Sequence, residues 1–450
     1  MGRVMTWTIT VVLVALAVAG AAAWTLAQDN RIDTVTPSAP ELAAFGSHAI
    51  GVRTIQVTDK NRPDILQTAA GAPTARYDRT LTLEVWYPAS LSEAQRPGGE
   101  YRAVTRDPAV TATLRGKAVR DAAPLTTAGS FPLVIISHGY PGNRYLMSHL
   151  GENLVSKGYV AVAIDHAEST YDDQKNFAST LYNRPFDQLF VLNEMARLGA
   201  GGSDSFLAGL VDAARTGLVG YSMGGYGVVN VVGGGFRTAA ASYPMAPPNQ
   251  LLLDRGADTP AYQASRDPRI KSAVAIGPWG MQVGYWDAAG LGGIRTPLLL
   301  VAGSVDDVSG YEKGTRAIFE GAVNAERYLL TFLHANHNAA APMPAPAESY
   351  AYSAALPGFP FAHYADAVWD TVRMNNILAH FVTAHFDAHL KGDRTRLSYF
   401  EVVANGKDAV FAMDRDGKPQ PTHTYWKGFK RGTAAGLVLE HGTPAAAPLR

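Results

Sequence analysis

The chain contains 450 residues, of which 47% are hydrophobic, so it is long and apolar enough to bury the core of one large α/β domain. Lysine plus arginine equals aspartate plus glutamate at 39 each, which indicates no basic surface for nucleic acid and favours neutral, apolar substrates. The absence of cysteine excludes thiol redox chemistry, disulfide bonds and thiolate metal sites.

Residues 1–27 have the pattern of an export segment. Met1-Gly2-Arg3 carries one positive charge, residues 8–23 are almost wholly apolar, and Thr25-Leu26-Ala27 ends the run with small residues at a suitable spacing for cleavage. The pattern predicts a signal peptide, with an uncleaved membrane anchor as the alternative because residues 6–27 are long enough to cross a bilayer. In either form the rest of the chain is expected to be secreted or periplasmic.

The remainder of the chain divides into three parts by composition. Residues 28–45 contain proline, serine and threonine and are expected to form a linker. Residues 46–395 are expected to form one catalytic domain, and residues 396–450 an extension packed on that domain.

Strand-like and helix-like segments alternate through the expected catalytic domain. Edge strands are predicted over 50–57 and 80–87, core strands over 131–137, 159–164, 218–221, 271–276, 296–303 and 327–333, and helices over 145–157, 185–198, 226–232 and 364–390. This alternation predicts an α/β fold with a mostly parallel, doubly wound sheet and helices on both faces. The long connections 242–265 and 339–361 are interpreted as lids or substrate walls, with surface padding as the alternative.

The most informative motif is Gly220-Tyr221-Ser222-Met223-Gly224-Gly225, which lies between a predicted strand and a predicted helix. A G-x-S-x-G pattern in this position predicts a nucleophile elbow, in which a strained turn exposes the serine hydroxyl. Glycine is required there because a Cβ would collide with neighbouring backbone. Ser222 is therefore the candidate nucleophile, and the alternative is a glycine-rich turn with an incidental serine.

A nucleophilic serine needs a base and an acid that orients the base. Both are expected after the elbow, in the chain order Ser, Asp, His. Asp306 lies in the turn after one predicted strand and His337 in the loop after the next, so we expect Ser222, Asp306 and His337 to form a catalytic triad. Asp307 and His334 are the neighbouring alternatives; Asp307 is read as a solvated turn carboxylate or a helix cap, and His334 as a residue at the end of its strand.

Two turns are expected to supply backbone amides to an oxyanion. One amide is that of Met223, directly after the nucleophile, and the other is that of Tyr140 in His138-Gly139-Tyr140-Pro141-Gly142. Tyr221 and His138 are expected at the edge of the substrate pocket. We expect His138 to hold its loop by hydrogen bonding.

These motifs resemble the platelet-activating-factor acetylhydrolase and dienelactone-hydrolase-like branch of the α/β-hydrolases. The resemblance rests on residues 131–139, 158–166 and 220–225 and extends over most of the chain, from Gly51 to Asp393. It implies an α/β-hydrolase fold with lid-like insertions. The chain departs from this branch in its greater length and in the absence of cysteine, which excludes a cysteine nucleophile and a stabilising disulfide.

The surroundings of the serine also resemble bacterial polyester hydrolases and cutinase-like enzymes. In those proteins the serine is followed by Met-Gly-Gly, a tyrosine follows the oxyanion-loop glycine, and a Pro-Trp pair follows the sixth strand. The resemblance implies Tyr140 and Met223 as oxyanion donors, and Trp279, in Gly277-Pro278-Trp279-Gly280, as an aromatic wall for an acyl group. The alternative for Trp279 is a core tryptophan that packs under its loop.

The function that fits these features is an exported serine ester hydrolase acting through an acyl-enzyme on small, lipid-like or polymeric carboxylic esters. A serine peptidase of the same fold and a non-catalytic exported binding protein are the alternatives. No cofactor or metal is expected: His385 and His389 lie one helical turn apart, but the sequence supplies no third ligand. Asp165-His166, at the end of a predicted strand, is expected to have a structural hydrogen-bonding role. The sequence does not indicate an oligomeric state.

Overall fold

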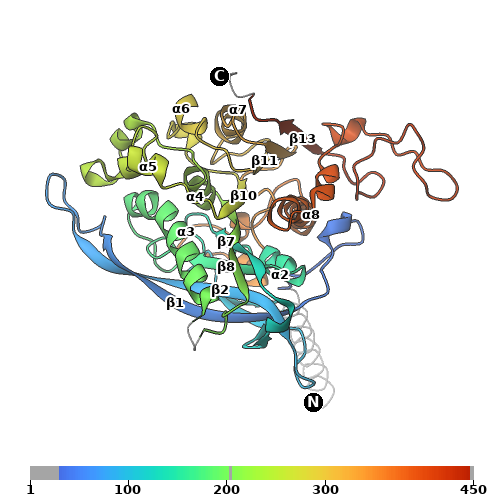
Figure 1. The fold of residues 1–450 in the computed structure, drawn as a ribbon, viewed down its shortest axis with the longest axis horizontal. Helices are drawn as coiled ribbons and strands as arrows, with labels where there is room; N and C mark the ends of the chain where they lie inside the picture. The colour runs from blue at the N-terminus through green and yellow to red at the C-terminus, as the bar shows by residue number, and fades with distance from the viewer. Residues whose placement is uncertain (1–29, 202–204, 446–450) are drawn as a thin grey trace, which may run out of the picture.

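The computed structural model describes residues 30–201 and 205–445 of the chain (Figure 1). The predicted signal peptide or membrane anchor, residues 1–27, lies outside these ranges. Within them, no helix is long and apolar enough to cross a membrane.

One large sheet forms the centre of the fold. Its strands, in spatial order, are β13 (Leu437–Gly442), β12 (Arg327–Phe332), β11 (Leu298–Gly303), β10 (Ile270–Ile276), β9 (Val211–Tyr221), β7 (Phe131–Ser137), β8 (Val160–Asp165), β2 (Arg76–Ser90), β1 (Ala49–Pro63) and β5 (Val119–Arg120), with β6 (Ala123–Pro124) paired to β2. The strands from β12 to β8 are parallel, whereas β13 and β2 pair antiparallel at the two ends of this parallel block. The prediction of a mostly parallel α/β sheet is therefore confirmed.

Helices cover both faces of the sheet. The helices are α2 (Ser148–Ser156), α3 (Phe177–Ala200), α4 (Met223–Val231), α5 (Pro260–Ala264), α6 (Ala288–Leu291), α7 (Ala317–Gly321) and α8 (Thr371–Leu390). Because successive strand residues point to opposite sides, Leu133 and Ile135 of β7 pack with α3 and α4, and Val134 and Ile136 pack with α2 and α8. Figure 1 shows α2 and α8 on one side of the central strands and α3 on the other.

Helix α3 begins at Phe177, well before the predicted start at Pro185. The side chain of Asn176 caps it by accepting a hydrogen bond from the amide of Ala178, and Pro185 lies inside the helix. Proline has no N–H, so the carbonyl of Leu181 lacks its usual helical donor. The hydroxyl of Tyr226 in α4 donates to that carbonyl at 3.0 Å, which explains why the proline is tolerated and links the two helices.

Helix α8 begins at Thr371, later than the predicted start at residue 364. The side chain of Asp370 caps it, accepting from the amide of Arg373 at 2.7 Å. Before that cap, the chain forms only a short 3-10 helix, η8 (Pro360–His363), and a turn. The capping side chain of Asp370 therefore sets the start of α8.

Strands β1 and β2 are longer than predicted and form one continuous antiparallel ribbon. They span 15 residues each, and their pairing runs from Ala49 opposite Ala89 to Pro63 opposite Arg76. Figure 1 shows the pair curving along one edge of the molecule. Contrary to the expectation of two edge strands, β2 is an interior strand, because β8 pairs along its other side. The small hairpin of β3 (Glu100–Val104) and β4 (Thr111–Arg115) was not predicted.

The expected linker is packed against the domain. Ile32 and Ala43 are buried, and the side chain of Asn30 donates to Glu348 at 2.8 Å. These buried positions hold residues 30–45 against the domain. At the other end of the chain, β13 extends the sheet and Trp426 packs against Phe381 of α8, so the extension is packed on the same domain.

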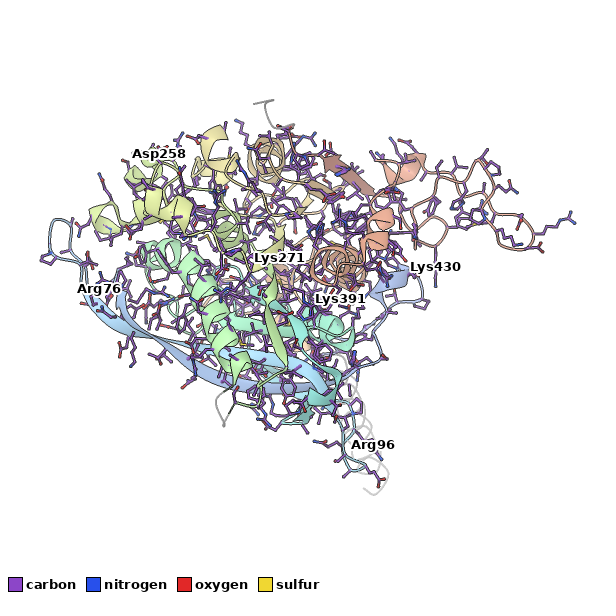
Figure 2. The ribbon with its side chains drawn as sticks, viewed as in Figure 1. Arg76, Arg96, Asp258, Lys271, Lys391 and Lys430 are labelled. Carbon is purple, nitrogen blue, oxygen red and sulfur yellow. The ribbon has the colours of Figure 1, made fainter. Side chains whose placement is uncertain are left out.

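Charged side chains lie at the surface and in the interior, and Figure 2 shows Arg76, Arg96 and Lys430 at separate margins of the molecule. In the interior, Glu84 of β2 is fully buried and pairs with Arg120 and Arg144. Because a buried carboxylate without a partner is strongly destabilising, these arginines are needed to keep β2 in the sheet.

Buried neutral histidines are a further feature of the core. His149 of α2 is 6% exposed, and neither ring nitrogen has a hydrogen-bond partner in the described part of the chain. Burial lowers the pKa of His149 to about 3. Burial likewise lowers the pKa of His380 in α8 to about 3. Both rings are therefore uncharged in the folded protein at neutral pH.

These histidines predict that acid destabilises the fold. An unfolded histidine takes up its proton near pH 6.5 and buried His149 only near pH 3, so between these values the unfolded state binds more protons. Each such histidine lowers the free energy of unfolding by up to about 1.4 kcal/mol for each pH unit that the pH falls within this window. We expect His149→Leu to lose less Tm between pH 7 and pH 5 than the parent protein.

The matched control is His334→Asn, which replaces an exposed histidine and should keep the acid dependence of the parent. Asparagine suits this position because the φ of residue 334 is 66°. Identical pH dependence of Tm in His149→Leu and the parent would contradict the prediction.

Candidate active site

Ser222 occupies the sharp turn between β9 and α4. Its φ of 53° and ψ of −113° lie in a region that residues other than glycine rarely adopt. The amide of Ser222 donates to the carbonyl of Ile276 at 2.9 Å, and its own carbonyl accepts from the amide of Tyr226 at 2.9 Å. The strained turn is therefore held by β10 on one side and by the first turn of α4 on the other, as in a nucleophile elbow.

Two glycines make this turn sterically feasible. A Cβ added at Gly220 would lie 2.3 Å from the carbonyl carbon of Gly224. A Cβ added at Gly224 would lie 1.9 Å from the carbonyl oxygen of Ser137 at the end of β7. Only glycine fits at both positions, which is the steric requirement behind the G-x-S-x-G pattern.

Asp306 and His337 form a close pair at the same edge of the sheet. Nδ1 of His337 lies 3.0 Å from Oδ1 and 2.9 Å from Oδ2 of Asp306. Oδ1 also accepts hydrogen bonds from the amides of Val308, at 2.9 Å, and Ser309, at 2.8 Å. Burial opposes the ionisation of Asp306, but His337 and these two amides hold the pKa of Asp306 below its ordinary value. The carboxylate is therefore ionised at neutral pH.

The alternative residues lie differently. The side chains of Asp307 and His334 are both exposed. The amide of His334 donates to the hydroxyl of Ser304 at 2.7 Å, which fixes the backbone of that residue. The geometry thus pairs Asp306 with His337, while Asp307 lines a cavity next to this pair.

Ser222 and His337 line one cavity of about 240 Å³. Its walls come from the loop after β7, the elbow, the turn after β11, the His337 loop and the segment before α8. The lining residues are Gly139, Tyr140, Pro141, Tyr221, Ser222, Asp307, Val308, Asn336, His337, Asn338, Ala362 and His363. Within the described residues, no hydrogen bond joins the side chains of Ser222 and His337. Such contacts are often long in free enzymes and shorten when substrate binds.

Tyr221 lines the cavity and contacts both His337 and Asn338. It is buried, its ring centroid lies 5.1 Å from that of His337, and its hydroxyl donates to Oδ1 of Asn338 at 3.0 Å. Nδ2 of Asn338 in turn donates to the carbonyls of Ala362, at 2.9 Å, and Ala365, at 2.7 Å. Asn338 was not predicted as a site residue, and its position next to His337 was the only signal in the sequence.

The chain directly after the predicted segment 339–361 forms one wall of the cavity, whereas the segment itself supplies no lining residue in the described part of the chain. Ala362 and His363, just past the predicted segment 339–361, line the cavity, and Nε2 of His363 lies 2.8 Å from the hydroxyl of Tyr171. Burial lowers the pKa of His363 to about 3, so this ring is neutral. The other long connection, 242–265, supplies none of the residues that line this cavity within the described ranges.

Two backbone amides border the serine as expected for an oxyanion site. Met223 is the first residue of α4, and Tyr140 follows Gly139, whose added Cβ would lie 3.3 Å from the Cβ of Ser222. Neither amide donates a hydrogen bond to another residue in the described ranges. Both donors are therefore free to bind a negatively charged oxygen at the serine.

Trp279 and His138, which the sequence places at the pocket, are not among the residues that line this cavity. The half-buried ring of Trp279 packs edge-on against Phe177 at 5.2 Å, while its amide donates to the carbonyl of Ser222 at 3.2 Å. The ring of His138 is buried and bonds to its own loop and to His166. Each side chain has a packing or hydrogen-bond partner outside the lining of the cavity.

His385 and His389 lie on α8 with ring centroids 4.8 Å apart, and His385 is fully buried. Within residues 30–201 and 205–445, no three His, Asp or Glu side chains are grouped as metal ligands.

Two family models match parts of the chain. The model described as "PET hydrolase-like" matches residues 116–260, and the model of platelet-activating factor acetylhydrolase, isoform II, matches residues 47–183. The first match includes Tyr140 and Ser222, but both end before Asp306. Each covers less than half of the chain.

Among solved structures, a ferulic acid esterase from Streptomyces cinnamoneus matches with a TM-score of 0.52 and 21% sequence identity. The match covers 80% of this chain and 93% of the esterase chain. The protein has the α/β-hydrolase fold. The strand order, the helices on both faces and the elbow between β9 and α4 all belong to that fold.

Curated relatives of this α/β-hydrolase include cutinases. Cutinase est1 and cutinase est2 of Thermobifida alba and cutinase 2 of Thermobifida cellulosilytica are each 23% identical over 180 residues, which is 40% of this chain. The aligned part is 44%, 43% and 50% of those proteins, so the chain spans about half the length of the curated relatives it matches.

The steric fit of the elbow predicts an unusual effect of alanine at Gly224. In an ordinary helix, Gly→Ala stabilises by up to about 1 kcal/mol. At Gly224 the new Cβ would meet the carbonyl of Ser137, so we expect Gly224→Ala to lower the free energy of unfolding by about 1–3 kcal/mol.

Denaturant unfolding measures this change. The matched control is Gly358→Ala, whose Cβ would have no neighbour closer than 3.7 Å and which should leave stability within about 0.5 kcal/mol of the parent. A Gly224→Ala protein as stable as the parent would show that the elbow tolerates a side chain there.

Proposed function

We propose that this α/β-hydrolase is a serine ester hydrolase that cleaves carboxylic esters through an acyl-enzyme. The proposal is carried by one observation: Ser222, on a strained elbow, lines the same cavity as His337, which is paired with buried Asp306. The cutinases and the ferulic acid esterase among the similar proteins support an ester as the substrate class.

In the proposed reaction, Nε2 of His337 accepts the proton of the Ser222 hydroxyl while the serine oxygen attacks the ester carbonyl. The amides of Met223 and Tyr140 donate hydrogen bonds to the resulting oxyanion. His337 then gives its proton to the leaving alcohol, and the acyl group remains on Ser222. Water, deprotonated by His337, attacks this acyl-enzyme; the bond to the Ser222 oxygen breaks, that oxygen takes the proton back from His337, and the carboxylic acid is released.

Asp306 determines the orientation of the base. Because its ionised carboxylate lies 2.9 Å from Nδ1 of His337, the Nδ1–H tautomer is favoured and Nε2 is left as the acceptor. The same carboxylate stabilises the imidazolium that forms when His337 takes the serine proton.

The cavity suits the reacting end of an ester. Its volume of about 240 Å³ is below the range of about 300–1,000 Å³ that is typical of sites enclosing a whole drug-sized ligand. It holds a small acyl or alcohol group, with the rest of a lipid-like or polymeric ester extending outside. We assign Tyr221 to the cavity wall and Trp279, with His138, to the surroundings that shape it.

Export is also part of the proposal and rests on the sequence of residues 1–27. A cleaved segment would release the hydrolase outside the cytoplasm, and an uncleaved one would hold it at a membrane. Either form would act on esters that the cell encounters outside the cytoplasm.

The decisive experiment is Ser222→Ala. We expect hydrolysis of p-nitrophenyl esters to fall by at least about 10³-fold, with little change in Tm, because the serine supplies the attacking oxygen. A fluorophosphonate should label the parent protein and not the variant. Ester hydrolysis near the parent rate in Ser222→Ala would overturn the proposal, and amide cleavage faster than ester cleavage would favour a peptidase.

Two matched pairs test the acid and the base. We expect Asp306→Asn and His337→Gln to lower kcat by about 10³- to 10⁴-fold, because the first leaves the wrong histidine tautomer and the second removes the base. His334→Asn alters an exposed neighbour and should keep kcat within about threefold of the parent, and Asp307→Asn, at the cavity wall but not paired with His337, should lower kcat far less than Asp306→Asn. Larger losses in the second pair than in the first would reverse the assignment.

A further inference from the structure

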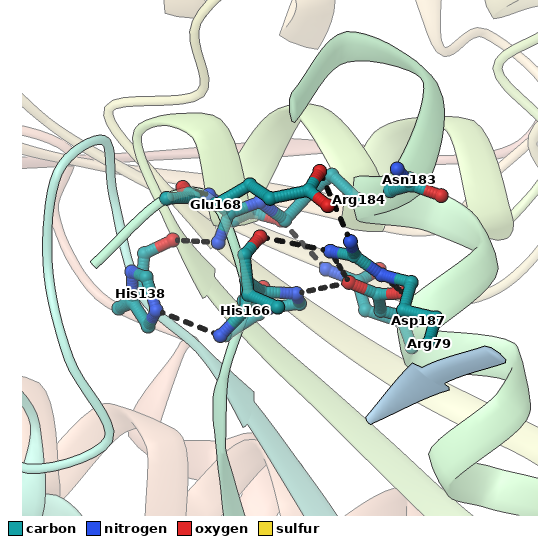
Figure 3. A network of polar contacts seen from close by, with 12 residues as sticks. Arg79, His138, His166, Glu168, Asn183, Arg184 and Asp187 are labelled. Atoms are coloured by element: carbon teal, nitrogen blue, oxygen red, sulfur yellow. Dashed lines mark hydrogen bonds and ion pairs between the residues drawn. The ribbon is translucent and has the colours of Figure 1, made fainter. Parts of the chain in front are cut away.

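One turn of α3 lies directly beneath the loop that carries Tyr140. It presents Arg184, Asp187 and Gln188 on one face, since residues three and four apart are neighbours on a helix. These side chains are 1%, 0% and 1% exposed. The proposed mechanism assigns no role to this buried polar cluster, although Figure 3 shows Arg184 and Asp187 next to His138 and His166.

Arg184 and His138 both bind carbonyls of the loop after β7. Nη1 of Arg184 donates to the carbonyl of His138 at 2.8 Å, and Nη2 donates to that of Gly139 at 3.4 Å. Nδ1 of His138 lies 2.7 Å from the same Gly139 carbonyl. This carbonyl belongs to the peptide unit whose N–H is that of Tyr140.

The tautomer of His138 follows from its second contact. The backbone N–H of His166 lies 3.2 Å from Nε2 of His138 and can only donate, so Nε2 must be an acceptor. Burial, together with the charge of Arg184, holds the pKa of His138 well below its ordinary value, so the ring is neutral. The single ring proton is therefore on Nδ1, where it is donated to the carbonyl of Gly139.

His166 is held in turn by Asp187. Nδ1 of His166 lies 2.9 Å from Oδ2 of Asp187, and Nε2 lies 2.8 Å from the hydroxyl of Ser137 (Figure 3). Asp187 also accepts two hydrogen bonds of 2.9 Å from Arg79 and one of 3.1 Å from Arg62. Burial opposes its charge, but Arg79, His166 and Arg62 hold the pKa of Asp187 far below its ordinary value.

The peptide between Gly139 and Tyr140 is trans, so its carbonyl and its N–H point in opposite directions. Donors that hold the carbonyl of Gly139 on the α3 side leave the N–H of Tyr140 pointing away from α3. Tyr140 lines the cavity beside Ser222, and its amide has no acceptor in the described part of the chain.

We propose that Arg184 and His138 are positioning residues that orient the Gly139–Tyr140 peptide, so that the Tyr140 amide is aimed at the oxyanion. The inference rests on the proposed function, because it assigns a role in stabilising the same tetrahedral intermediate. Neither side chain touches substrate. Gln188 supports the other donor segment, since its Nε2 donates to the carbonyl of Gly224 in the first turn of α4 at 3.0 Å.

The test compares His138→Leu with His138→Asn. The leucine removes the donor to Gly139, whereas the asparagine amide replaces Nδ1–H at nearly the same place. Removing one oxyanion donor costs about 10²- to 10³-fold in kcat, so a misaimed one should cost about 10- to 100-fold. We expect that loss in His138→Leu, with KM within about threefold, and recovery of most of it in His138→Asn.

A second pair of variants uses α3 itself. Arg184→Lys keeps the buried positive charge but loses the two-pronged contact with the carbonyls of His138 and Gly139, and it should lower kcat about tenfold with little change in KM. Arg197→Met, on the exposed face of the same helix, removes a surface pair with Glu194 and should leave kcat unchanged. A boronic acid that mimics the tetrahedral intermediate should bind more weakly in proportion to each loss of kcat.

The outcomes separate this inference from the proposed function. Loss of activity in Ser222→Ala together with parent kcat in His138→Leu and Arg184→Lys would overturn the positioning role alone. Retained activity in Ser222→Ala would overturn both. If His138→Leu does not fold, Arg184→Lys and the boronic acid affinity decide: unchanged values contradict the inference, and parallel losses support it.

Discussion

The contact between Gly224 and the carbonyl of Ser137 is the constraint on which the site depends. It brings the start of α4 against the end of β7, so the elbow and the loop after β7 become neighbours. The strained φ of Ser222 and the short distance from Gly139 to Ser222 follow from the same close packing. A fold that relaxed this contact would separate the two backbone segments from which the proposed oxyanion amides come.

The buried polar groups around this contact are hydrogen-bonded to one another, and the histidines among them are neutral. His138 and His166 are both neutral because burial disfavours their charged forms, and each uses one ring nitrogen as a donor and the other as an acceptor. Neutral rings can hold backbone groups in fixed directions without placing additional charge beneath the serine. Among the ionised members, Asp187 and Arg79 pair with each other, and Arg184 is the cation that donates to the carbonyls of the loop after β7.

The parts of the site that follow local rules were predictable from the sequence. Gly220 and Gly224 are required by backbone sterics within a few residues of Ser222, so the elbow could be recognised directly. Asp306 could be favoured over Asp307 by its place in the turn, but the contact itself depends on which carboxylate turns toward His337, which only the structure gives.

Long-range contacts explain what the sequence did not reveal. The early start of α3 could not be predicted because Pro185 is tolerated only through the hydroxyl of Tyr226, far along the chain. The role of Arg184 could likewise not be predicted, because it belongs to no sequence motif and its partners are backbone carbonyls of the loop after β7. The long connection 339–361 was recognised, but the residues that line the cavity lie on either side of it, where Asn338 binds the carbonyls of Ala362 and Ala365.

The position of β13 has a consequence for how the protein is made. Strand β12, which leads into the His337 loop, pairs with β11 on one side and with β13 on the other, and β13 is the last strand among the described residues. Until residues 437–442 have been synthesised, the outer backbone groups of β12 remain unpaired. An open edge of this kind is a template for strand addition by another chain, so late arrival of β13 makes newly made chains prone to aggregation.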